Sequence, residues 1–213
     1  WASPWGEGFP GWHIECSAMA QKHLGAQIDI HTGGEDNIFP HHECEIAQSE
    51  CSGPSPFVRM WLHKRRIDMG GEKMSKSIGN VLTLPDVIAR GFDPLDLRYL
   101  LLAVHYRTQL KFTWKGLEDA RKARQRVVEW MEEVSRKPIT HMNVDAEHAQ
   151  MSELHARTQN FSDAMDSDLN TPAALAAVFD CMAWSRNRRA WNDATRSELQ
   201  AFIGRVRLTF GCF

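Results

Sequence analysis

The chain has 213 residues, enough for one large domain or two small ones with a substantial core. It is 43% hydrophobic and 24% charged, which is typical of a soluble globular protein, and its formal charge of −2 argues against a uniformly basic nucleic-acid-binding surface. No apolar run reaches membrane-spanning length and no signal peptide is visible, so we expect no membrane partner. Five cysteines without disulfide-framework spacing indicate a reducing, cytoplasmic compartment.

The first third of the chain predicts parallel α/β architecture. Residues 1–10 have the Trp, Pro and Gly content of a loop, and a helix follows that ends near Gly25. Residues 28–31 predict a short buried strand, residues 40–51 a helix and residues 58–66 a second strand. Strands that alternate with helices in this order favour a parallel sheet.

The turn after the first predicted strand carries potential metal ligands. A glycine pair turns the chain, and Pro40 suits the first turn of a helix. His41 and Glu45 then lie four residues apart on one helical face. Together they can hold one Zn²⁺, with Cys16 of the preceding segment as a thiolate ligand. At this point an ordinary surface His–Glu pair and a small buried cysteine remain the alternative.

A lysine- and serine-rich loop follows the second predicted strand. Its residues Lys73, Ser75 and Lys76 lie in KMSKS, between glycine-rich flanks. Such a loop can fold onto a polyphosphate, since ammonium groups neutralise charge while hydroxyls and backbone N–H groups donate hydrogen bonds. The alternative is a solvated basic turn that serves only solubility.

The second half predicts an α-helical bundle. An Asp-Pro start at residue 93 opens one helix, and residues 117–134 form an amphipathic helix with a basic face. Residues 137–149 are expected to be a connector, and Thr171 is expected to cap a later helix. Further helices are predicted at 154–165, 172–184 and 194–209. The expected fold is thus an α/β domain, residues 1–88, followed by a helical region, residues 89–213.

Several of these segments resemble one family, the cysteinyl-tRNA synthetases of class I. KMSKS at 73–77 is a signature of that class, and GWHIECSAM (11–19) and FPHHECEIAQ (39–48) resemble the family's cysteine-pocket segments. DLRYL (96–100) and SDLNTPAAL (167–175) resemble its helical region. The resemblance implies the C-terminal half of a Rossmann-like catalytic domain followed by a helical bundle. It also implies that a HIGH motif and a fourth ligand, a cysteine, belong to an N-terminal half that this chain lacks.

The resemblance assigns roles to individual residues. Cys16, His41 and Glu45 match three of four ligands of one zinc ion per chain, which binds the substrate thiolate. Because Zn²⁺ prefers sulfur to a hydroxyl, cysteine can be distinguished from serine without an editing site. Trp12 matches the floor of the cysteine pocket and Asp36 an acidic residue near the substrate ammonium group, while His31 is expected to line the same pocket.

The remaining roles concern ATP and tRNA. Lys76, and with it Lys73, would stabilise the pyrophosphate as the cysteine carboxylate attacks the α-phosphate of Mg²⁺-bound ATP, with Ser75 in the same ATP site. The activated cysteine then passes to tRNA(Cys). The basic face of the amphipathic helix supplies candidates for tRNA phosphate contacts: Arg121, Lys122, Arg124 and Arg126. A monomer is expected, and the chain alone is expected to be inactive.

Two positions depart from the family pattern, and two other functions compete. Cys44 stands where the family usually has Asn, and we expect it to pack beside the metal rather than bind it; Glu35 replaces a small or apolar residue. The competing functions are the related ligase that joins cysteine to glucosaminyl-inositol in mycothiol synthesis, and a non-catalytic zinc- and RNA-binding paralogue. A zinc hydrolase is excluded because no His-Glu-x-x-His arrangement occurs.

Overall fold

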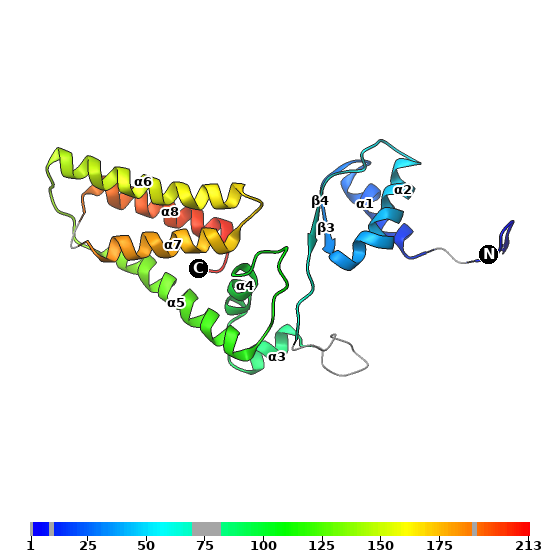
Figure 1. Cartoon of the computed structure of the whole chain (residues 1–213), viewed down its shortest axis with the longest axis horizontal. Coiled ribbons are helices and arrows are strands. Elements are labelled where there is room, and N and C mark those ends of the chain that lie inside the picture. Colours follow the sequence, from blue (N-terminus) through cyan, green and yellow to red (C-terminus); the bar gives the residue numbers. More distant parts are fainter. Residues whose placement is uncertain (1, 9–10, 70–81, 189–190) are drawn as a thin grey trace. The chain divides into compact units, whose positions relative to one another are not determined.

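The computed structural model describes residues 2–8, 11–69, 82–188 and 191–213, which form two compact units (Figure 1). Unit 1 contains Trp1–Arg66 and Tyr106–Gln109, and unit 2 contains Ile67–His105 and Leu110–Phe213. The KMSKS loop lies outside the described residues. The sequence predicts a domain boundary between residues 88 and 89, whereas the two compact units meet between Arg66 and Ile67. The two domains, 1–88 and 89–213, remain a proposal.

Unit 1 has the parallel α/β architecture that its sequence predicts. In chain order it contains β1 (Ala2–Ser3), β2 (Gly6–Glu7), α1 (His13–Leu24), β3 (Ile28–Gly34), α2 (Glu43–Glu50) and β4 (Val58–Lys64). Strands β3 and β4 pair in parallel, with His31 opposite Trp61. A parallel pair needs a crossover connection, and α2 with its flanking turns supplies it. The antiparallel pair of β1 and β2 was not predicted, since that segment reads as a loop.

The turn before α2 is less regular than its sequence suggests. A 3-10 turn, η1 (Glu35–Asn37), leads into a wider turn, η2 (Ile38–His42), in which Phe39 has extended backbone angles. Regular helix therefore begins at Glu43 and not at Pro40. His41 and Glu45 still face each other across one turn, since their side-chain atoms lie 2.8 Å apart.

Unit 2 is helical, and its helices begin at polar caps. Asp93, Thr113 and Asn192 each accept a backbone N–H of the first turn of their helix, which satisfies a donor that the helix itself cannot pair. The helices are α3 (Leu84–Ala89), α4 (Pro94–Leu102), α5 (Trp114–Arg136), α6 (Val144–Asp166), α7 (Thr171–Arg186) and α8 (Asp193–Phe210).

Two predicted boundaries in this unit are wrong. Helix α6 begins ten residues before the predicted start, in the segment expected to be a connector, because the Asn143 side chain accepts the N–H of Ala146 and caps it there. Helix α7 is capped by Asn170, which accepts the N–H of Ala173, so Thr171 is its first helical residue and not its cap.

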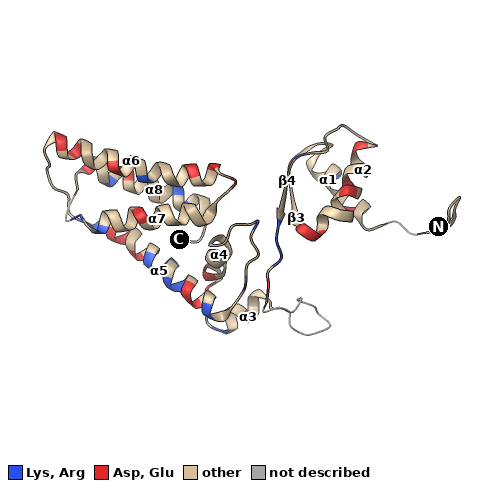
Figure 2. Ribbon diagram, in the orientation of Figure 1, with Lys and Arg blue, Asp and Glu red and all other residues tan. Residues whose placement is uncertain are grey.

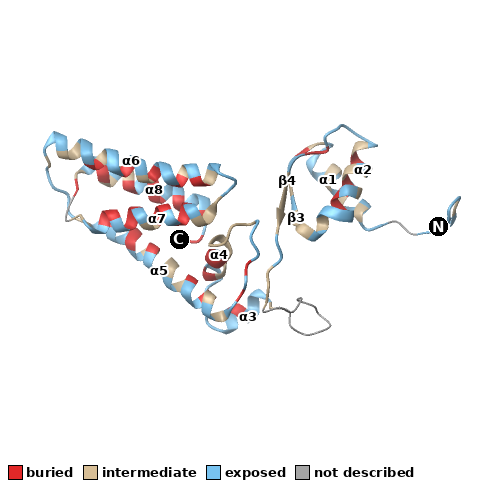
Figure 3. Cartoon of the chain, in the orientation of Figure 1, coloured by how far each residue is buried: buried red, intermediate tan, exposed pale blue. Residues whose placement is uncertain are grey.

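The core of unit 2 lies between the long helices. The buried faces of α5, α6, α7 and α8 point toward one another (Figure 3). On α5 the predicted amphipathic pattern is confirmed, since Leu117, Val127, Trp130 and Val134 are all buried. None of the helices in the described ranges is both long and apolar enough to cross a membrane.

Candidate metal centre

The two helices of unit 1 bring a thiol, an imidazole and a carboxylate together. Cys16 comes from α1, His41 from the turn before α2, and Glu45 from the first turn of α2. One ligand atom from each lies within 4.8 Å of the others. These are the three metal-ligating residues that the sequence predicts, and thiolate, imidazole and carboxylate are the ligands that Zn²⁺ takes in proteins, at about 2.0–2.3 Å.

Glu45 is the centre of this cluster. Its side chain is 0% exposed, and its Oε2 lies 2.7 Å from Nε2 of His31. Its Oε1 lies 2.8 Å from Nε2 of His41, yet this separation lacks hydrogen-bond geometry and Oε1 has no hydrogen-bond partner. A buried carboxylate oxygen without a proton donor is costly unless a cation balances it. The residues present therefore fit a divalent metal ion at the point where Cys16, His41 and Glu45 converge.

The outer side of His41 is supported by two aromatic side chains. Its Nδ1 lies 2.5 Å from Nδ1 of His13, and the Trp12 ring stacks on it with centroids 3.8 Å apart and planes at 21°. A metal-bound histidine is usually oriented through its second ring nitrogen, as His13 would do here. Trp12 is 56% exposed although its ring stacks on His41, which is itself buried at 6% exposure.

Behind the cluster lies a second group of histidines. His31, His42 and Glu45 also have ligand atoms within 4.8 Å, and Nδ1 of His42 lies 2.7 Å from Nε2 of His63. Burial, followed by repulsion from His31, His63 and His41, lowers the pKa of His42 to about 4, so this imidazole is neutral at pH 7. A neutral ring can orient neighbouring groups without adding positive charge beside a metal.

Two glycines at the end of β3 lie close to side chains of this region. A Cβ on Gly33 would lie 2.6 Å from Cε1 of His42, and one on Gly34 would lie 2.5 Å from Oδ1 of Asp36. The His42 ring is buried and cannot move aside, so Gly33 is required for its close approach to the end of β3. The exposed Asp36 carboxylate could swing away from a Cβ on Gly34, so that glycine is less strictly required.

The thiol of Cys16 responds to the same environment. Burial, then the charges of Glu45 and Glu15, raises the pKa of this thiol above its ordinary value. In the absence of a cation the sulfur therefore keeps its proton, and metal binding would release it. Cys44 belongs to neither of the two ligand groups found among the described residues, and its expected packing beside the metal stays a prediction.

The other predicted site residues are placed as follows. His31 lies in the cluster through its contact with Glu45. Asp36 lies exposed on η1, so its role toward a substrate remains a prediction. Glu35, the unusual neighbour of Asp36, lies 3.5 Å from the guanidinium of Arg65, which balances its charge. Lys73, Ser75 and Lys76 lie outside the described residues.

The predicted basic face of α5 has a different composition in the structure. Acidic and basic residues alternate along this helix (Figure 2), and Lys122 pairs with Glu118 at 3.0 Å. The guanidinium groups of Arg121 and Arg124 bind Asp96 of α4. These two arginines therefore serve helix packing, and their expected role in phosphate contacts is not supported; Arg126 remains exposed.

Comparisons with known proteins identify two family domains in this chain. Residues 1–122 match the family model of the class I (C) tRNA synthetase catalytic domain, and residues 160–211 match the DALR domain. A cysteine–tRNA ligase of Chlamydia caviae is 49% identical over 180 residues, 84% of this chain and 37% of that protein. One from Symbiobacterium thermophilum is 48% identical over 184 residues, 84% of this chain and 39% of that protein.

A solved structure shares the fold. It is the crystal structure of the LeuRS–tRNA–LeuAMS ternary complex of Agrobacterium radiobacter, with a TM-score of 0.65 at 16% identity, covering 86% of this chain and 26% of that one. The chain spans less than half the length of its curated relatives, 37% and 39% of the two named above.

Proposed function

Because the chain belongs to the class I (C) tRNA synthetase family, we propose that the complete protein carrying it activates cysteine with ATP and transfers it to tRNA(Cys). The family supports an aminoacyl-tRNA ligase as such. Family membership alone does not establish three points, which form the proposal: that the substrate is cysteine, that zinc binds it, and that the residues named below have the roles given.

One observation carries the proposal: Cys16, His41 and Glu45 converge, and the buried Oε1 of Glu45 has no hydrogen-bond partner. When bound there, zinc would supply a Lewis acid with high affinity for a thiolate and low affinity for a serine hydroxyl. This chain would supply three protein ligands. The complete protein would supply the fourth, and the substrate thiolate would bind the metal as a further ligand. Selectivity for cysteine would then follow from ligand chemistry.

The chain's own residues would position the substrate. Trp12 stacks on His41, and in the proposed site its flat ring would form the floor of the pocket and exclude side chains longer than that of cysteine. Asp36 is an exposed carboxylate near the end of β3, suited to accept the α-ammonium group in a charge-assisted hydrogen bond. His31 holds Oε2 of Glu45 and thereby leaves Oε1 for the cation.

The activation step would use the KMSKS loop. Lys73 and Lys76 would neutralise charge on the departing pyrophosphate, and Ser75 would hydrogen-bond the phosphates, with Mg²⁺ accompanying ATP. The cysteine carboxylate attacks the α-phosphate, the bond to the β-phosphate oxygen breaks, and cysteinyl adenylate and pyrophosphate result. The ribose hydroxyl at the tRNA 3′ end then displaces AMP.

A pair of cysteine variants tests the metal site. In the complete protein, Cys16→Ser should lower zinc content by elemental analysis and cysteine-dependent ATP–pyrophosphate exchange together, since a hydroxyl is a poor zinc ligand. Cys44→Ser is the matched control and should preserve both. Full zinc occupancy in Cys16→Ser would remove Cys16 from the site.

The acceptor needs a separate test. Labelled cysteine offered to the complete protein should appear on tRNA and not on glucosaminyl-inositol, because the relatives are named cysteine–tRNA ligases. Transfer to the amino sugar would favour the mycothiol-pathway ligase. Zinc binding with no cysteine-dependent exchange would favour the non-catalytic paralogue.

A further inference from the structure

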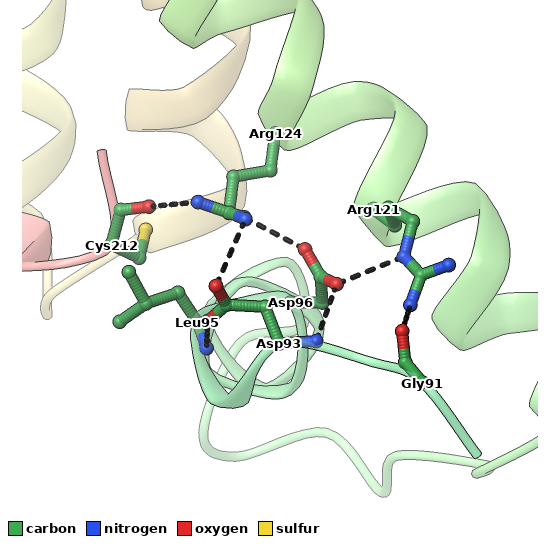
Figure 4. Close-up of polar contacts among 7 residues, drawn as sticks. All are labelled: Gly91, Asp93, Leu95, Asp96, Arg121, Arg124 and Cys212. Atoms are coloured by element: carbon green, nitrogen blue, oxygen red, sulfur yellow. Dashed lines mark hydrogen bonds and ion pairs between the residues drawn. The ribbon is translucent and has the colours of Figure 1, made fainter. Parts of the chain in front are cut away.

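Asp96 lies at the point where α4 meets α5, in a network of polar contacts shown in Figure 4. Its side chain is 1% exposed. Its Oδ1 accepts Nε of Arg124 at 2.8 Å, and its Oδ2 accepts Nε of Arg121 at 3.0 Å and the backbone N–H of Asp93 at 3.1 Å. One buried carboxylate thus caps α4 and ties it to two arginines of α5.

The arginines extend the network to neighbouring segments. Arg121 also donates to the carbonyl of Gly91, and its guanidinium lies 4.0 Å over the ring of Phe92. Arg124 donates to the carbonyl of Cys212 at 3.3 Å, just beyond α8. The link between α3 and α4, the start of α5 and the end of α8 are therefore held by contacts that meet at Asp96.

Charge in the network is balanced. Arg124 also lies 3.9 Å from the Asp93 carboxylate, so two guanidinium groups face two carboxylates. Burial by itself would raise the pKa of Asp96, but the hydrogen bonds from Arg124, Arg121 and the Asp93 amide outweigh it and leave that pKa below its ordinary value. Asp96 is therefore ionised at pH 7, and its removal would leave two cations close together.

The apolar side of α4 contacts the two ends of the segment that contains the KMSKS loop. Leu97 and Leu101, one turn apart on α4, line a cavity of about 100 Å³. Ile67 and Met69, before that segment, and Leu82, after it, line the same cavity. Both ends of the segment are thus packed against the helix that Asp96 fixes.

Each end is also held by backbone or capping contacts. Before the loop, the N–H of Asp68 donates to the carbonyl of Leu110 at 2.7 Å, and the N–H of Phe112 donates to the carbonyl of Asp68 at 2.8 Å. After the loop, Thr83 and Asp86 form a capping box at the start of α3. These anchors belong to α3 and to the segment before α5, and residues of both, Val87 and Phe112, line the same cavity as Leu97 and Leu101 of α4. The spacing of the anchors therefore depends on how α4 packs against them.

We propose that Asp96 is a positioning residue for adenylate formation, which it would serve by fixing α4 and thereby the two ends of the loop that carries Lys73 and Lys76. This inference rests on the proposed function. Phosphoryl chemistry in such a site depends on placing ammonium groups within a fraction of an ångström, and a misplacement of about 1 Å can cost about 100-fold in rate. Asp96 touches neither substrate nor ATP in this role.

The test uses Asp96→Asn in the complete protein, because the amide keeps the size of the side chain and loses its charge. We expect adenylate formation in pre-steady-state experiments to slow by up to about 100-fold. Cysteine affinity and zinc content should stay at the wild-type level. Leu199→Ala is the matched control, since it removes a fully buried side chain of unit 2 outside the network. It should lower the melting temperature and leave the rate of adenylate formation unchanged well below that temperature.

A second variant covers the case in which Asp96→Asn does not fold. In Arg121→Lys the lysine keeps a positive charge near Asp96, but its single ammonium group cannot bind both the Asp96 carboxylate and the Gly91 carbonyl as the planar guanidinium does. This variant should therefore slow adenylate formation less than Asp96→Asn. The inference would be overturned if folded Asp96→Asn and Arg121→Lys proteins formed adenylate at the wild-type rate. It would also be overturned if their cysteine affinity fell as much as their rate, or if Leu199→Ala slowed adenylate formation as much as they do. Absence of adenylate formation in the wild-type protein would instead overturn the proposed function and this inference with it.

Discussion

Gly204 lies in the interior of α8, where glycine costs more conformational entropy than alanine. A Cβ placed on Gly204 would meet no atom within 4 Å, and the residue is exposed. Gly204→Ala should therefore add the full helix-propensity gain, about 1 kcal/mol, with no steric cost to offset it. For a chain of this size that corresponds to a rise of about 2–4 °C in melting temperature.

Gly116 is the matched control within the same unit. A Cβ there would lie 3.0 Å from Oγ1 of Thr113, the atom that caps α5 by accepting the Gly116 N–H at 2.9 Å. Gly116→Ala should gain helix propensity but disturb a cap worth about 1 kcal/mol, so little net change is expected. Gly204→Ala should thus exceed Gly116→Ala by about 1 kcal/mol in the free energy of unfolding.

Urea unfolding followed by circular dichroism at the helical band measures this difference. A fall in unfolding free energy for Gly204→Ala would show that the space beside α8 is filled, and it would refute the reasoning. Unchanged slopes of free energy against urea concentration are required, since a changed slope would signal a different unfolded state. A stabilised Gly204→Ala protein with poorer tRNA charging would indicate that this helix face contacts the nucleic acid.

Three further predictions concern single side chains. Lys76→Ala in the complete protein should slow adenylate formation by about 100- to 1,000-fold, as for a lost transition-state donor, without changing zinc content; an equal loss of cysteine affinity would contradict the assigned role. The folded-state pKa of Asp96 lies below its ordinary value of 3.8, so its contribution to stability is complete above pH 3.8 and is lost as the pH falls through the folded-state pKa. Acid titration of stability should therefore show the deficit of Asp96→Asn shrinking below that pH, and a constant deficit would contradict the ion pairs. Asn170→Ala should lower the unfolding free energy by about 1 kcal/mol while Thr171→Ala changes it less, and the reverse order in urea unfolding would restore Thr171 as the cap.

The sequence predicts well those features that depend on neighbours along the chain. Helices α4, α7 and α8 carry polar caps and apolar periodicity, and α4 and α7 also have a proline in the first turn. Helix α4 begins within one residue of its predicted start, and α7 and α8 lie within two residues of their predicted ranges. The His41–Glu45 pair is equally local, one helical turn. The start of α6 escaped prediction because its first turns carry few apolar residues, although Asn143 supplied a capping signal.

Features that depend on distant pairing could not be predicted from these patterns. His13 meets His41 from 28 positions away because α1 packs against α2. His63 of β4 meets His42 from 21 positions away because β3 and β4 pair in one parallel register. A period-two pattern in β4 places His63 on the face of Trp61 but does not say which residue lies opposite. Likewise the amphipathic pattern of α5 identifies its polar face, whereas Asp96, 25 positions before Arg121, decides what that face contacts.

The membership of Tyr106–Gln109 in unit 1 has a consequence for biosynthesis. The backbone N–H of Arg65 donates to the carbonyl of Tyr106 at 3.2 Å, so a contact of the first unit spans the intervening part of the second. A ribosome releases the chain from its N-terminus, and unit 1 therefore remains incomplete until the residues after α4 have left the exit tunnel. During translation unit 1, which includes Cys16, His41 and Glu45, is therefore completed only after the first helices of unit 2 have been synthesised.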